Sequence, residues 1–114
     1  QIVGLGTPAD AIIGPPGTRS LLLPGAAGTA AAFLHGSEFA HLHPDGSLHL
    51  CLPPDLAYDA LVKGWALAHP LAGVRLSAGL VLVRAPRNGA ERETVTAVVA
   101  AARRYAAAET AKIN

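Results

Sequence analysis

Three histidines lie close together in the chain at positions that can bring their side chains to one point: His41, His43 and His49. Neutral imidazole nitrogens suit Zn, Fe, Cu and Ni, and such a metal with an open coordination position activates water or polarises a carbonyl group. Imidazole also titrates near neutral pH, so it serves as an acid or base without a metal. The residue types therefore predict a metal site or an acid–base site.

A β-hairpin is the element that must position these histidines. Pro44-Asp45-Gly46 supplies a fixed φ, a turn former and a residue that tolerates left-handed backbone, as a short hairpin loop requires. The predicted cross-strand pairs are His43 with Ser47, Leu42 with Leu48, His41 with His49, Ala40 with Leu50, and Phe39 with Cys51. Alternation predicts one apolar face made of Ala40, Leu42, Leu48, Leu50 and Leu52. The opposite face then carries Phe39, His41, His43, Ser47, His49 and Cys51.

Further candidate ligands flank the hairpin. Alternation puts Glu38 on the leucine face unless a β-bulge turns it toward the histidines. His69 and Cys51 are additional candidates, although Cys51 is expected to be a buried spectator rather than a nucleophile. A purely structural role, with the histidines half-buried on the outer face of a sheet, stays open beside the functional interpretations.

The remaining elements follow from glycine, proline and apolar spacing. Residues 1–28 are rich in glycine and proline and are expected to form an irregular entry segment with a short helix around Pro8 to Ile13. The pattern predicts a strand over residues 79–84 and a buried strand over residues 29–36, although the alanines of the latter would equally suit a helical turn. It also predicts a helix from Pro54 to Gly64 and a long helix from Asn88 to about Ala111, with Asn88 and Glu91 as its capping pair. Residues 1–114 are expected to form a single α+β domain. Its fold is predicted to be a two-layer sandwich, with an antiparallel sheet of about four strands and the helices on one face.

Composition excludes several classes of partner. The formal net charge of +1 gives no field that would favour nucleic acid or an anionic membrane as the main partner. The longest apolar run, from Ala26 to Leu34, is too short to cross a bilayer. With Cys51 as the single cysteine, no internal disulfide can form, so a reducing compartment is favoured and a cytoplasmic location is expected.

The stretch from Glu38 to His49, followed by Gly64-Trp65 and His69-Pro70, resembles a small bacterial and fungal domain known as the luciferase family. The resemblance covers roughly residues 32–87, and it implies a site formed by Glu38, His41, His43 and His69. His49 falls at a position that varies more in that family. The family name predicts neither light emission nor a substrate, and nothing here resembles the barrel luciferases that use flavin, whose fold is more than twice as long.

The sequence thus predicts a small enzyme or ligand-binding domain with a histidine-rich site on a hairpin. The candidate catalytic residues are His41, His43, His69 and Glu38, and the candidate metal ligands are His41, His43 and His49. A divalent Zn, Fe, Cu or Ni ion is the candidate cofactor, and a small organic molecule is the candidate ligand. The alternative is a non-catalytic binding or protein-interaction module that uses the outer face of the hairpin.

Overall fold

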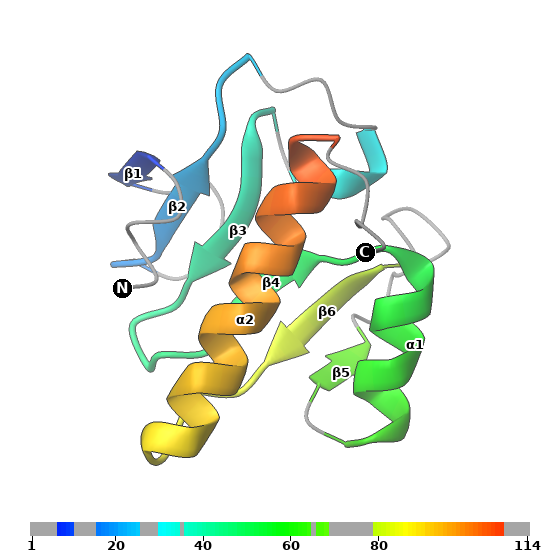
Figure 1. Ribbon diagram of the computed structural model, residues 1–114. Helices are drawn as coiled ribbons and strands as arrows, with labels where there is room; N and C mark the ends of the chain where they lie inside the picture. Colours follow the sequence, from blue (N-terminus) through cyan, green and yellow to red (C-terminus); the bar gives the residue numbers. More distant parts are fainter. Residues whose placement is uncertain are drawn as a thin grey trace.

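The computed structural model describes residues 7–10, 16–25, 30–34, 36–64, 66–68 and 79–108. Within these ranges the strands are β1 (Thr7–Asp10), β2 (Arg19–Leu22), β3 (Glu38–Leu42), β4 (Leu48–Cys51), β5 (Ala66–Ala68) and β6 (Leu80–Val83). The helices are η2, a 3-10 turn (Ala30–Ala32), α1 (Pro54–Val62) and α2 (Gly89–Ala106). All strand pairs are antiparallel, in the order β1-β2-β3-β4-β6-β5. Both α-helices cover one face of the sheet (Figure 1), so the predicted α+β two-layer sandwich is confirmed.

The amino-terminal part of the chain differs from the prediction. Residues 1–28 are not an irregular segment, because β1 and β2 pair within them, and β1 occupies the start of the helix expected around Pro8 to Ile13. The described residues therefore give a sheet of six strands rather than about four. Both strands are four residues long, and β1 contains Pro8, so the two strands are formed by pairing with their neighbours rather than by local pattern. The single-domain organisation stays a prediction.

A second correction concerns residues 29–36, where a strand was predicted and a helical turn was the alternative. Ala30–Ala32 form the 3-10 turn η2 instead, and Ala32 is buried in the core. Alanine has low β-propensity, so this short alanine-rich run adopts a helical turn. β5 was not expected either, because three residues carry too little pattern to indicate a strand.

The hydrophobic core lies between the sheet and the helices. Its buried side chains come from the helix-facing side of β2, β3, β4 and β6 and from the inner faces of α1 and α2; they include Leu21, Ala40, Leu48, Leu50, Val81, Val83, Ala57, Ala60, Val95, Val99 and Ala102. Since side chains alternate along a strand, the neighbours of these residues point to the face that the helices leave uncovered. His41, His49 and Leu82 lie on that uncovered face.

The start of α2 is fixed by the predicted capping pair. Asn88 has an extended backbone, and its side chain accepts a hydrogen bond of 2.9 Å from the backbone N–H of Glu91. This bond satisfies one of the amide groups that have no partner within a helix's first turn.

We expect Asn88→Ala to lower the free energy of unfolding by about 1 kcal/mol, since the loss of a side-chain cap typically has this effect. Urea denaturation followed by circular dichroism measures the change. Asn88→Ser, which keeps a capping oxygen, should remain close to the wild type. Equal stability of the alanine and wild-type proteins would contradict a capping role for Asn88.

Among the described residues, no helix is both long enough and apolar enough to span a membrane.

Candidate functional site

The hairpin β3–β4 has the predicted register. Ala40 pairs with Leu50, His41 with His49, and Leu42 with Leu48. At the turn, the backbone N–H of His43 donates to the carbonyl of Ser47 at 2.8 Å, and Gly46 has a φ of 91°, a left-handed conformation that favours glycine. A Cβ atom at Gly46 would lie 2.9 Å from the Cβ of Ala85, so this turn also packs closely against the residues after β6.

The three predicted metal ligands converge. One potential ligand atom from each of His41, His43 and His49 lies within 4.8 Å of the others, and the ring centroids are 4.8–5.2 Å apart. Nε2 of His41 is 3.1 Å from Nδ1 of His49. Two nitrogens bound to one tetrahedral ion at about 2.0–2.1 Å are separated by roughly 3.3 Å. The arrangement therefore needs only a small adjustment to hold an ion between these two rings.

Glu38 reaches the histidine face through a β-bulge. Opposite β2, Leu21 pairs with Ala40 but Leu22 pairs with Glu38, so Phe39 is the extra residue on β3. The extra residue turns Glu38 toward His41, whose Nδ1 lies 3.4 Å from Oε2 of Glu38. The possibility that a bulge re-aims Glu38 is thus confirmed. The predicted pair of Phe39 with Cys51 does not form, and Phe39 packs in the core instead of on the histidine face.

A chain of hydrogen bonds determines which ring nitrogen of His43 is available to a metal or a substrate. The hydroxyl of Ser47 donates to Oδ1 of Asp45 at 2.6 Å and lies 2.8 Å from Nδ1 of His43. A hydroxyl group has one proton to donate, so Nδ1 of His43 must carry the proton that Ser47 accepts. The lone pair of Nε2 then remains available to a metal or a substrate.

Electrostatics keep His43 in the state that a metal requires. Burial lowers its pKa, and the neighbouring His41 lowers it further, while Asp45 acts in the opposite direction. The hydrogen bonds from Ser47 also lower the pKa of Asp45, so this carboxylate is ionised at neutral pH. Metal ions bind neutral imidazole, so a lowered pKa favours binding at neutral pH.

Cys51 lies on β4 two residues after His49 and is 1% exposed. Burial raises the pKa of its thiol to about 12, and the charge of Glu38 acts in the same direction. Because the thiolate is the nucleophilic form, this thiol is unreactive at neutral pH. The interpretation of Cys51 as a buried spectator is therefore favoured over a catalytic cysteine.

The structure brings together four of the five predicted site residues: His41, His43, His49 and Glu38. His69 lies outside the described residues, so its contribution stays a prediction. Sequence reasoning missed two groups that support the histidines. Ser47 was placed on the correct face without a role, and Ser20 was missed because its strand was not expected.

Beside the histidines the uncovered face becomes apolar. Leu82 of β6 pairs with His49, and Leu67 of β5 pairs with Leu82, so one row of side chains runs from the histidines to the edge of the sheet. Leu82 is partly exposed and Leu67 is 58% exposed. A molecule bound at the histidines would therefore have apolar surface beside it.

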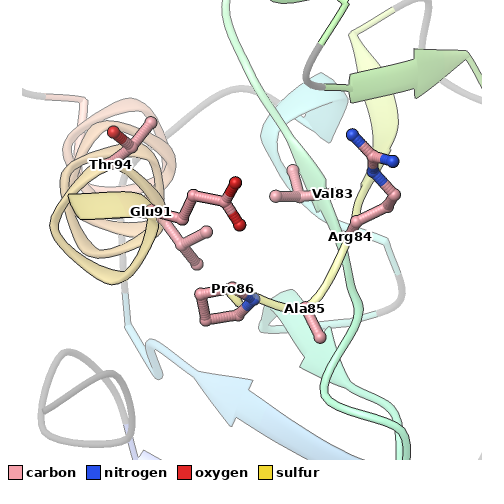
Figure 2. Close-up of a pocket in the computed structure, with 7 residues that line it drawn as sticks. Val83, Arg84, Ala85, Pro86, Glu91 and Thr94 are labelled. Carbon is pink, nitrogen blue, oxygen red and sulfur yellow. The ribbon is translucent and has the colours of Figure 1, made fainter. Parts of the chain in front are cut away.

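A separate cavity of about 210 Å³ lies between the end of β6 and the start of α2. It is lined by Val83, Arg84, Ala85, Pro86, Glu91, Thr94 and Val95, and the Glu91 side chain points into it (Figure 2). None of the four described site residues lines this cavity. Its carboxylate is already paired, because Arg87 forms two-pronged hydrogen bonds with Glu91 at 2.7–3.2 Å.

The pair of Arg87 and Glu91 predicts a pH dependence of stability. Hydrogen bonds from Arg87 lower the pKa of Glu91 from 4.5 to about 2. A group whose pKa is lower in the folded state stabilises the protein above its unfolded pKa, and that contribution is lost as pH falls toward the folded pKa. We expect Glu91→Gln to be less stable than the wild type at pH 7 and equally stable near pH 2. Urea denaturation at both pH values measures this; a difference that is independent of pH would contradict it.

Comparison with protein families identifies one match. The Luciferase domain family matches residues 36–102, more than half of the 114-residue chain, including all of β3, β4, α1, β5 and β6 and most of α2. The matched segment contains Glu38 and the three clustered histidines, whereas β1 and β2 lie outside it. Searches of curated proteins and of solved structures gave no match. On the family match, this chain belongs to the Luciferase domain family.

Proposed function

We propose that this protein is a small metal-dependent enzyme in which His41, His43 and His49 hold a divalent transition metal and act on a small organic molecule. The convergence of three imidazoles from two paired strands is the observation that carries the proposal. Three histidine ligands leave a coordination position for water or substrate, as in catalytic zinc sites.

The protonation of the side chains supports this proposal. His43 presents Nε2, because its Nδ1 proton is accepted by Ser47. His41 has Glu38 beside its Nδ1, so a proton on this nitrogen leaves Nε2 for the metal. A metal-bound histidine almost always donates its other N–H to a nearby acceptor. At His43 this acceptor is the hydroxyl of Ser47, and at His41 the carboxylate of Glu38 lies 3.4 Å from Nδ1.

When bound, the metal would supply a Lewis acid that activates water or polarises a substrate oxygen. The chain's own residues orient the imidazoles, and the apolar row of Leu82 and Leu67 offers a surface for the body of an organic substrate. Zn²⁺, Fe²⁺, Cu²⁺ and Ni²⁺ all suit imidazole ligands, so the donor set leaves the metal open.

Metal content tests the proposal. Tag-free protein purified without chelators is analysed for transition metals, together with His49→Ala and the control Asp59→Asn. His49 is only partly buried, so its truncation is tolerated by the fold, and Asp59 is an exposed carboxylate of α1. We expect close to one metal per chain in the wild type and in Asp59→Asn, and a large loss in His49→Ala. Wild-type protein that contains no metal and takes up none of the four added ions would overturn the proposal.

The alternative function is a binding or interaction module without catalysis. The exposed Leu67 at the edge of the sheet favours it, because exposed apolar side chains beside a polar cluster are typical of contact surfaces. Metal content distinguishes the two functions: wild-type protein that binds none of the four ions would favour this alternative.

We also propose a cytoplasmic location. Cys51 is a free, buried cysteine, and free thiols persist in reducing compartments.

A further inference from the structure

Ser20 is a buried polar residue on β2, next to the site but outside the segment that matches the family. It is 5% exposed and pairs across the strands with His41, so its side chain shares the histidine face. Its hydroxyl donates a hydrogen bond to Oε2 of Glu38. A buried hydroxyl needs such a partner, and this one is a carboxylate beside a proposed metal ligand.

The same carboxylate oxygen faces His41. Oε2 of Glu38 is 3.4 Å from Nδ1 of His41, and on the other side of that ring Nε2 is 3.1 Å from Nδ1 of His49. A continuous series of polar groups therefore crosses β2, β3 and β4, formed by Ser20, Glu38, His41 and His49. Nδ1 of His41 is a buried nitrogen without a hydrogen bond of good geometry among the described residues.

We propose that Ser20 is a positioning residue of the metal site: it holds the carboxylate of Glu38 against Nδ1 of His41, so that Nε2 of His41 faces the other histidines. This inference rests on the function proposed above. The β-bulge at Phe39 turns Glu38 to this face, and the hydroxyl of Ser20 contacts the carboxylate there. The metal site then depends on a strand that the family match does not include.

Metal affinity and the tautomer of His41 are the two measurements that test this role. Co²⁺ titration of Ser20→Ala, in competition with a chelator, should give a dissociation constant about 10–100 times that of the wild type, the usual effect of losing a group that supports a metal ligand. Ser20→Thr keeps the hydroxyl and should remain within about threefold of the wild type on the same reasoning. Thr96→Ala removes a hydroxyl from α2, on the other side of the sheet, and should leave the affinity unchanged.

The second measurement is ¹⁵N NMR of the histidine side chains in metal-free protein. We expect the wild type to carry the His41 proton on Nδ1, and Ser20→Ala to show a mixture of tautomers. A merely structural role for Ser20 would lower stability without moving this spectrum. If Ser20→Ala does not fold, Ser20→Cys, which is similar in size and a weak donor, should show the same changes to a smaller degree.

The outcomes separate this inference from the proposed function. An unchanged Co²⁺ affinity and an unchanged His41 tautomer in the folded variant would overturn the role of Ser20 while leaving the metal site intact. If the wild type binds neither Co²⁺ nor Zn²⁺, the metal function fails, and the metal-site role of Ser20 fails with it. In that case, a changed His41 tautomer in Ser20→Ala would still support the positioning of His41 by Ser20 and Glu38. An unchanged tautomer would overturn this positioning role as well.

Discussion

Adding Zn²⁺ at about a hundred times its dissociation constant is expected to raise the melting temperature of this protein by roughly 10–20 °C, and EDTA should reverse the change. An ion that binds only the folded state stabilises it by about 2.7 kcal/mol at this excess, and each kcal/mol shifts the melting temperature of a domain of this size by about 4–8 °C. The binding groups lie on two strands and come together only when the hairpin is paired, so the unfolded chain lacks the site. Thermal unfolding of tag-free protein with and without Zn²⁺ measures the shift.

Two variants show whether the histidine cluster is responsible. His43→Ala removes a ligand whose side chain is partly exposed, and should abolish most of the shift while changing the metal-free melting temperature little. Asp59→Asn changes an exposed carboxylate on α1 and should keep the full shift. A shift of equal size in His43→Ala would show that Zn²⁺ binds elsewhere on the chain. No shift in the wild type would show that the folded protein does not bind Zn²⁺ and would contradict the proposed site.

Phe39→Ala is expected to lower the free energy of unfolding by about 3–5 kcal/mol, as large aromatic-to-alanine changes in cores do. Phe39 is fully buried and packs in the cluster between the sheet and the helices. With a total stability of roughly 5–15 kcal/mol for a typical domain, this loss is a large fraction of the whole. Urea denaturation measures it, with the slope of the transition as a check that unfolding remains two-state.

Phe39→Leu is the matched control for this prediction. Leucine keeps most of the buried apolar volume, so the loss should be below about 2 kcal/mol. Because Phe39 is also the extra residue of the bulge, Phe39→Ala loosens the position of Glu38, and we expect weaker Co²⁺ binding in the fraction that remains folded. A loss of less than about 1 kcal/mol in Phe39→Ala would contradict close packing around this ring.

The hairpin was predictable from sequence because the residues that determine it lie close together in the chain. Pro44, Asp45 and Gly46 determine the turn, the turn determines the register, and the register brings His41 opposite His49. The capping of α2 by Asn88 was predictable for the same reason. In both cases the residues that decide the structure lie within a few positions of each other.

The bulge at Phe39 depends on residues that are far apart in the sequence. Its register shift lies between Leu21 and Leu22 of β2, and Leu22 precedes Glu38, the first residue of β3, by 16 positions. Nothing between Glu38 and His41 indicates an extra residue, so alternation left the side of Glu38 open. The contact of Ser20 with Glu38 was missed for a related reason: β2 has four residues, and its position in the sheet comes from pairing with β3.

The bulge also changes which side chains a three-residue separation in the sequence brings to the same face of a strand. Glu38 and His41 are three residues apart, a separation that brings side chains together on a helix but places them on opposite faces of a regular strand. Here one inserted residue makes them neighbours. Deleting that residue would leave every polar group of the site in the sequence and yet turn the carboxylate away from the imidazoles. A glutamate three residues before a histidine, in a segment otherwise typical of a strand, can therefore be used to search other sheet proteins for carboxylate–histidine pairs that regular alternation would hide.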